Sequence, residues 1–119
     1  WLRVTGFLCI SPGYACGVCA LAENRFFASM VRSQTYRGHG VCDSGPYRFV
    51  RHPGYAGTIL ALFGIVLALG SLWALIPAAV ATLIAVIRTA LEDQTLQEEL
   101  NGYKEYAMRV RHKLIPGVW

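Results

Sequence analysis

Residues 45–57 bring together side chains that can bind charge or move protons, directly ahead of a long apolar stretch. The segment reads Gly-Pro-Tyr-Arg-Phe-Val-Arg-His-Pro-Gly-Tyr-Ala-Gly, and its candidate groups belong to Tyr47, Arg51, His52 and Tyr55. Ionisable groups at a membrane boundary are costly to place, so they are a functional-site hypothesis by default. Pro53 suits the first turn of a helix, where a missing N–H costs nothing. We therefore predict a ligand site at the start of a helix.

A second group of charged residues follows the apolar stretch. Arg88 and Glu92 are four residues apart, so they share one face of a helix. A surface ion pair would explain this spacing as well. In the functional interpretation, Arg88 holds an anionic substrate group and Glu92 holds a cationic or hydroxyl-bearing cofactor. The remaining acids of this helix are interpreted as a solvated face: Asp93, Glu98 and Glu99.

The composition indicates a membrane protein of one domain. Of the 119 residues, 55% are hydrophobic and only 15% are charged, whereas soluble domains average about 25% charged. The stretch from Tyr55 to Ile87 contains no charged residue. We predict an all-α integral membrane helical bundle. The net charge of +4 is attributed to cytoplasmic loops and anionic lipid, and no nucleic-acid partner is expected because the chain has no basic helix.

Four segments are predicted along the chain. They are a spanning helix (1–31, with a kink or break at Pro12-Gly13), a cytoplasmic cofactor loop (32–52), a helical hairpin with a polar extension (53–101), and an interfacial helix with a tail (102–119). The hairpin should turn at Gly70-Ser71, and Asn101-Gly102 is a signal for the end of the extension. Each arm of about 16–18 residues suits a hairpin that crosses a thin or shared bilayer, or one that barely spans it.

The charge pattern places the two flanks of the hairpin on one side of the membrane. Arginines and lysines precede and follow the hairpin, and its tip carries no charge. Because cytoplasmic loops are enriched in these residues, both flanks are predicted to be cytoplasmic. The polar loop and the polar extension then meet at one membrane face, where a site can be built.

Metal and disulfide chemistry are not expected. Cys16-Gly-Val-Cys19 matches a Cys-x-x-Cys pattern, but it lies in an apolar helix without a second pair, so these cysteines are interpreted as inert. The three histidines lack the spacing of a metal site, and we predict none.

Residues 24–119 resemble the isoprenylcysteine carboxyl methyltransferase family, particularly its short bacterial members. The matching stretches are Asn-Arg-Phe-Phe at 24–27, the whole motif at 45–57, Arg-x-x-x-Glu-Asp at 88–93, Gly-Tyr-Lys-Glu-Tyr at 102–106, and the closing Arg-Val-Arg-His-Lys-Leu-Ile-Pro-Gly-Val-Trp. That family usually has further N-terminal spanning helices, so we expect this chain, which starts at Trp1, to be an N-terminally truncated form.

The resemblance implies a membrane methyltransferase that uses S-adenosylmethionine. The cofactor contacts that it implies are Gln34, a wrapping loop of His39, Gly40, Val41, Cys42 and Tyr47, a central motif of His52, Pro53, Gly54 and Tyr55, and the carboxylate of Glu92. It also implies a substrate-side role for Arg88, and we assign Arg88 and Arg51 to the catalytic group. The chemistry agrees, because a sulfonium cofactor with a ribose diol suits a carboxylate and an aromatic wall.

The predicted acceptor is a membrane lipid or another lipid-linked or hydrophobic molecule, most simply a carboxylate as in isoprenylcysteine O-methylation. A thiol or an amine is also compatible with the residues. The alternatives are a phospholipid N-methyltransferase, an NADPH-dependent sterol-type reductase, and a membrane scaffold without activity. We expect a multi-pass protein of the bacterial inner membrane with its site facing the cytoplasm, and we assign no oligomeric state.

Overall fold

The computed structural model describes residues 1–23 and 41–119, and in these ranges the regular structure is helical. The helices are α1 (Leu2–Glu23), α2 (Pro53–Leu69), α3 (Leu75–Glu99) and α4 (Tyr103–Arg109), with 3-10 turns at η3 (Gly45–Arg48) and η4 (Leu72–Ala74). The predicted all-α class is confirmed. Gln34, His39 and Gly40 of the predicted cofactor site lie outside the described residues.

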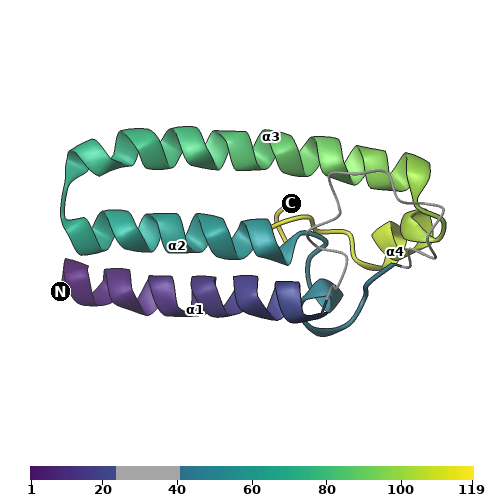
Figure 1. Cartoon of the computed structure of the whole chain (residues 1–119), viewed down its shortest axis with the longest axis horizontal. Coiled ribbons are helices and arrows are strands. Elements are labelled where there is room, and N and C mark those ends of the chain that lie inside the picture. The colour runs from purple at the N-terminus through teal and green to yellow at the C-terminus, as the bar shows by residue number, and fades with distance from the viewer. Residues whose placement is uncertain (24–40) are drawn as a thin grey trace.

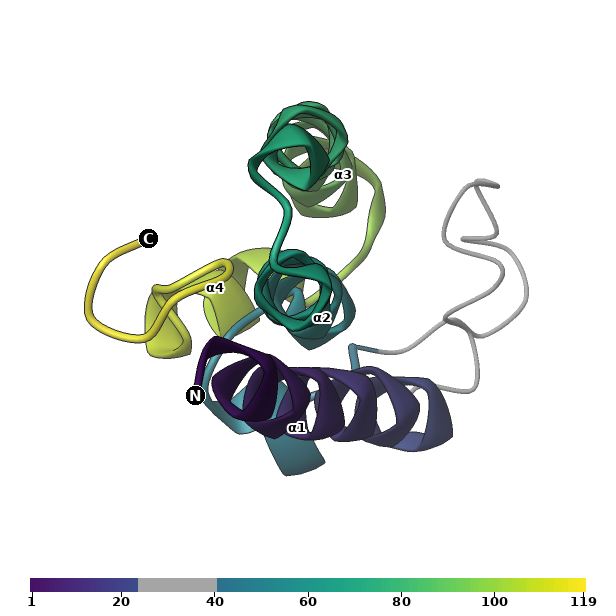
Figure 2. The same ribbon diagram turned by 90° about the vertical axis from the view of Figure 1, so that its left-hand side faces the viewer.

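The three long helices lie side by side in a bundle. Figure 1 shows α1, α2 and α3 running lengthwise, with α4 and the C-terminal tail gathered at the end where α2 begins. In the end-on view of Figure 2, α2 lies between α1 and α3. The chain therefore brings the start of α2, the last turns of α3 and α4 to one end of the bundle.

Two segments are long and apolar enough to cross a membrane: α1, and residues Leu72–Glu99, which comprise η4 and α3. Helix α2 has 17 residues, which is about 26 Å at 1.5 Å per residue, slightly less than a hydrocarbon core of about 30 Å. Large apolar side chains on the outside of the bundle are exposed, among them Leu8 on α1 and Leu83 on α3. This surface fits lipid, and the chain is a helical membrane protein.

Helices α1 and α2 are in backbone contact through glycines spaced seven residues apart. A Cβ atom added to Gly13 would lie 2.7 Å from the carbonyl oxygen of Gly57, and one added to Gly64 would lie 2.7 Å from that of Gly6. Small residues of this kind let membrane helices approach closely and associate by van der Waals packing. The position of α2, and of the site at its first turn, is set by this contact.

One local prediction was wrong in part and one was confirmed. The expectation at Pro12 was a kink or a break, and helix α1 continues through this residue without a break, because the backbone around Gly13 is held against α2 and spanning helices tolerate proline. The hairpin turn is where it was expected. Gly70 ends α2 with a φ of 63°, and its N–H donates to the carbonyl oxygens of Val66 and Leu67 at 3.1 and 3.2 Å.

Candidate active site

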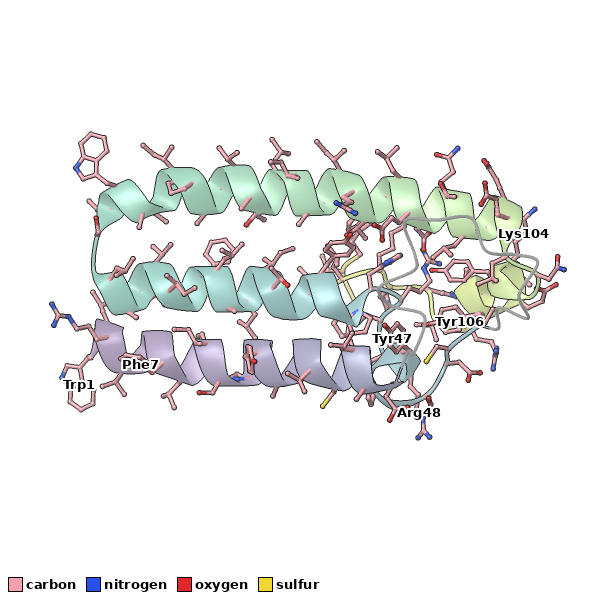
Figure 3. The ribbon with its side chains drawn as sticks, in the orientation of Figure 1. Trp1, Phe7, Tyr47, Arg48, Lys104 and Tyr106 are labelled. Atoms are coloured by element: carbon pink, nitrogen blue, oxygen red, sulfur yellow. The ribbon has the colours of Figure 1, made fainter. Side chains whose placement is uncertain are left out.

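The segment before α2 is held by the C-terminal part of the chain. The backbone N–H groups of Arg51 and His52 donate to the carbonyl oxygens of His112 and Lys113, both at 2.9 Å. The buried phenol of Tyr106 on α4 donates to the carbonyl oxygen of Tyr47 at 2.6 Å, and Figure 3 shows both tyrosines at this end of the bundle. Helix α4 and the tail thereby fix the motif at 45–57.

Asp93 of α3 is the centre of a buried polar cluster. The residue is 1% exposed, and its carboxylate accepts hydrogen bonds from His52 Nε2 (3.1 Å), Tyr103 Oη (2.9 Å), Gln97 Nε2 (2.7 Å) and Arg51 Nη2 (3.0 Å). We call these five residues the Asp93 cluster. The solvated position predicted for Asp93 is wrong, because the segment before α2 and helix α4 both pack their side chains against it.

The guanidinium of Arg51 contacts both Asp93 and α4. Its Nε lies 2.9 Å from Asp93 Oδ1 as an ion pair, without a hydrogen bond among the described residues, and its Nη1 donates to the carbonyl oxygen of Ala107 on α4 at 3.3 Å. Removing one partner of such a buried pair costs about 3–5 kcal/mol, because the other charge stays buried alone. Arg51 therefore ties the start of α2 to both α3 and α4.

A second cluster lies at the boundary between α2 and α3. Tyr55 Oη donates to Glu92 Oε1 at 2.7 Å, and Arg88 Nε donates to the same oxygen at 3.0 Å. The Arg88 and Glu92 side chains are 51% and 16% exposed. We call Tyr55, Arg88 and Glu92 the boundary cluster. The Arg88–Glu92 pair predicted from the spacing is present, and Tyr55 from the motif joins it.

The Glu92 carboxylate of the boundary cluster suits the cofactor that the sequence suggested. Both hydrogen bonds to Glu92 use Oε1, so among the described residues Oε2 carries none. A carboxylate oxygen without a partner can accept hydrogen bonds from hydroxyl or ammonium groups, and the Glu92 side chain is partly exposed. Arg88 and Glu92 also present opposite charges side by side.

The other predicted cofactor residues are spread around this end of the bundle. Val41 lies near Gly102 at the start of α4. Cys42 Sγ lies 3.4 Å from the carbonyl oxygen of Glu23, where α1 ends. Pro53 is buried in the first turn of α2, and Gly54 next to it lines a cavity of about 350 Å³ against α1. In the described ranges no three His, Cys, Asp or Glu side chains are grouped to hold a metal ion.

The buried tyrosines of α4 are held in the neutral form. Burial and the neighbouring Asp93 carboxylate raise the pKa of Tyr103 above its usual value. Burial also raises the pKa of Tyr106. The two rings meet edge to face, with centroids 5.4 Å apart. These phenols act as hydrogen-bond donors that join α4 to α3 and to η3.

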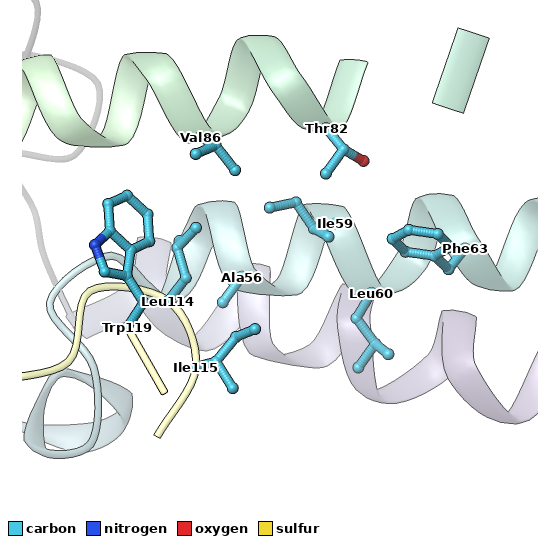
Figure 4. A pocket seen from close by; sticks show the side chains of 9 residues that line it. All are labelled: Ala56, Ile59, Leu60, Phe63, Thr82, Val86, Leu114, Ile115 and Trp119. Atoms are coloured by element: carbon cyan, nitrogen blue, oxygen red, sulfur yellow. The ribbon is translucent and has the colours of Figure 1, made fainter. Parts of the chain in front are cut away.

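An apolar cavity of about 440 Å³ lies between α2 and α3 and is closed at one end by the C-terminal tail (Figure 4). Thr82 is the one hydroxyl on its wall, and its Oγ1 is buried without a hydrogen-bond partner among the described residues. The full lining is Ala56, Ile59, Leu60, Phe63, Thr82, Val86, Leu114, Ile115 and Trp119. The sequence did not predict this cavity, because only the folded tail completes its wall.

Comparison with known proteins identifies the family. A family model described as phospholipid methyltransferase matches residues 1–101. A search of curated proteins and a search of solved structures each found no match. The resemblance to isoprenylcysteine carboxyl methyltransferases indicated the right superfamily of membrane methyltransferases, but the matching family is a different one within it. The match covers most of the chain and every residue of the two clusters except Tyr103. This protein therefore belongs to the phospholipid methyltransferase family.

Proposed function

We propose that this protein transfers a methyl group from S-adenosylmethionine to the headgroup of a membrane phospholipid, with an amine as the acceptor. The family is one of membrane methyltransferases that use this cofactor. The observation that carries the proposal is the boundary cluster, in which Glu92 and Arg88 present opposite charges next to Tyr55. The carboxylate suits a cationic cofactor, and the guanidinium suits the phosphate of a lipid headgroup.

Glu92 is the proposed cofactor residue. Its Oε1 is held by Tyr55 and Arg88, which leaves Oε2 to accept from a ribose hydroxyl or an ammonium group. The aromatic ring of Tyr55 supplies a flat wall beside the carboxylate. Gly54, in the same turn of α2, lines a cavity, so a ligand can approach the backbone there.

Arg88 and the apolar cavity are the proposed acceptor residues. Half of the Arg88 side chain is exposed, so the guanidinium can form a bidentate contact with a lipid phosphate. The cavity between α2 and α3 is apolar and is formed by the same two helices. A lipid could place its headgroup at Arg88 and one hydrocarbon chain against Ile59, Phe63 and Val86.

S-adenosylmethionine supplies an electrophilic methyl group on sulfur. The residues of this chain hold the acceptor in line with it and keep water away, and positioning of this kind can lower a barrier by several kcal/mol. An amine must lose its proton before its lone pair can attack, whereas a carboxylate is already ionised at neutral pH. The rate of an amine acceptor should therefore rise with pH up to the pKa of that amine.

The proposed orientation follows the charges. The lysines and arginines of the described residues that flank the hairpin include Arg48, Arg51, Lys104 and Arg109, whereas Gly70 and Ser71 at its tip are uncharged. Under the positive-inside rule these charges support a site on the cytoplasmic side of a multi-pass protein, and the membrane that we propose is the bacterial inner membrane.

Calorimetric titration of detergent-purified protein with S-adenosylmethionine tests the cofactor. We expect saturable binding that is lost in Glu92→Ala and kept in Glu99→Ala, because Glu99 is an exposed acid of the same helix. Thermal protection by NADPH in place of S-adenosylmethionine would instead support the reductase alternative. Equal binding by the wild type and Glu92→Ala would remove Glu92 from the site.

Incubation with radiolabelled cofactor and defined vesicles tests the acceptor. We expect label in the lipid when the vesicles contain phosphatidylethanolamine, and a raised KM for lipid in Arg88→Ala. Label in an isoprenylcysteine carboxylate, with none in the amine lipid, would favour the carboxylate acceptor. Activity that is unchanged in Arg88→Ala would contradict the role of this arginine.

A further inference from the structure

Asp93 is too deeply buried for a surface ion pair, and its carboxylate is too fully bonded to be a cofactor ligand. It is 1% exposed, and four side chains already donate to its two oxygens. No room is left on this carboxylate for a ligand. Its neighbour Glu92, in contrast, has one oxygen without a hydrogen bond among the described residues and is partly exposed.

The carboxylates of Asp93 and Glu92 are connected through the side chains of His52 and Tyr55, across the junction of α2 and α3. Asp93 Oδ1 accepts from His52 Nε2 at 3.1 Å. The ring of His52 lies beside the ring of Tyr55, with centroids 6.3 Å apart and planes tilted by 40°. Tyr55 then donates to Glu92 at 2.7 Å, and Glu92 is bonded to Asp93 through the backbone of α3.

His52 is well placed to transmit the position of Asp93 to Tyr55. It is the N-cap residue of α2, and its carbonyl oxygen accepts from the N–H of Ala56 at 3.1 Å. Because the residue is 4% exposed, its ring cannot turn without displacing its neighbours. A shift of His52 therefore changes the first turn of α2, which carries Tyr55.

We propose that Asp93 is a positioning residue, which holds His52 and through it the ring of Tyr55, and so orients the Glu92 carboxylate without contacting a ligand. Arg51 and His52 then belong to the supporting cluster and not to the ligand-binding surface. The consequence for the cofactor rests on the proposed function, whereas the coupling between Asp93 and Tyr55 does not.

The first test is independent of any ligand. Tyrosine labelled with ¹³C at Cζ gives one NMR signal per tyrosine, and the signal that disappears in Tyr55→Phe is that of Tyr55. We expect Asp93→Asn to move the Tyr55 signal, although the two side chains do not touch, and the matched control Glu99→Gln to leave it in place. An unmoved Tyr55 signal in folded Asp93→Asn protein would overturn the proposal.

A milder variant covers the case in which Asp93→Asn does not fold. Tyr103→Phe keeps the ring and the Arg51–Asp93 charge pair and removes only one donor to Asp93. We expect a smaller movement of the Tyr55 signal in this variant. If Asp93→Asn unfolds and Tyr103→Phe leaves that signal unmoved, Asp93 acts on stability alone and the proposal fails.

The second test separates positioning from stability. The dissociation constant of S-adenosylmethionine is measured well below the melting temperature of each variant. Asp93→Asn should raise it about tenfold in the wild-type background and leave it nearly unchanged in Tyr55→Phe, because coupled residues are not additive. Additive effects in the two backgrounds would contradict the coupling. Absence of binding by the wild type would count against the proposed function, and the NMR result would still decide the role of Asp93.

Discussion

The phenol of Tyr55 donates a hydrogen bond to the carboxylate of Glu92 at 2.7 Å, across the junction between α2 and α3. Tyr55 lies in the first turn of α2, and Glu92 lies near the end of α3. The two helices are joined at their other ends by the turn at Gly70. This bond therefore closes the hairpin at the end where the site is built.

Tyr55→Phe should weaken binding of S-adenosylmethionine more than it weakens the fold. The change removes one donor to a partly exposed carboxylate, and hydrogen bonds to charged groups are worth about 1.5–3 kcal/mol. Glu92 would then turn toward Arg88 and lose its orientation. Calorimetry should show a dissociation constant raised about tenfold, with a small change in melting temperature. Thr95→Val, which removes an exposed hydroxyl of α3 that is bonded within its own helix, is the control, and equal affinities in both variants would contradict this role.

The fold could be predicted from patterns that lie within single segments. The uncharged stretch up to Ile87 and the Gly70-Ser71 pair indicated the hairpin, and the four-residue spacing indicated the contact of Arg88 with Glu92. The glycines at positions 6, 13, 57 and 64 repeat every seven residues in two apolar segments. That period is a signal in the sequence for the α1–α2 contact.

The Asp93 cluster and the cavity could not be predicted in this way. Two partners of Asp93 come from 41 and 42 residues earlier in the chain, so no local period marks the residue as buried. The cavity depends on the return of the tail, in which Lys113 lies 4.5 Å from the ring centre of Trp119. Contacts of this kind depend on how whole helices dock, and that information is not contained in a window of sequence.

A methyl group at Gly57 should destabilise the bundle, whereas the same change at Gly17 should be tolerated. An added Cβ at Gly57 would lie 2.5 Å from the carbonyl oxygen of Gly13, and one at Gly17 would meet nothing within 4 Å. Overpacking of this kind costs about 1–3 kcal/mol, since the helices must separate. Thermal unfolding in detergent of Gly57→Ala and Gly17→Ala measures the difference. Equal melting temperatures would show that α1 and α2 are not in backbone contact.

Stability should fall steeply as the pH rises above about 10, the usual pKa of tyrosine. The pKa values of Tyr103 and Tyr106 are raised in the folded protein. Below pH 10 both states keep these protons, and above it the unfolded chain loses them first, which favours unfolding. Tyr103→Phe should reduce the fall in the free energy of unfolding between pH 9 and 11 by the contribution of one group, about 1.4 kcal/mol per pH unit at most. Thermal unfolding should then show a smaller fall in melting temperature over this range. An unchanged slope in Tyr103→Phe would contradict the burial of its phenol.

Filling the cavity between α2 and α3 should change which lipids are methylated. Val86 lines the cavity, so Val86→Phe places an aromatic ring where one hydrocarbon chain of the acceptor is proposed to lie. Val80→Phe makes the same change at a position that is 54% exposed, and it serves as the matched control. With a series of amine lipids that differ in chain length, Val86→Phe should raise the KM for long chains more than for short ones and leave the dissociation constant of S-adenosylmethionine unchanged. A chain-length profile shared by both variants and the wild type would mean that the acceptor does not use this cavity.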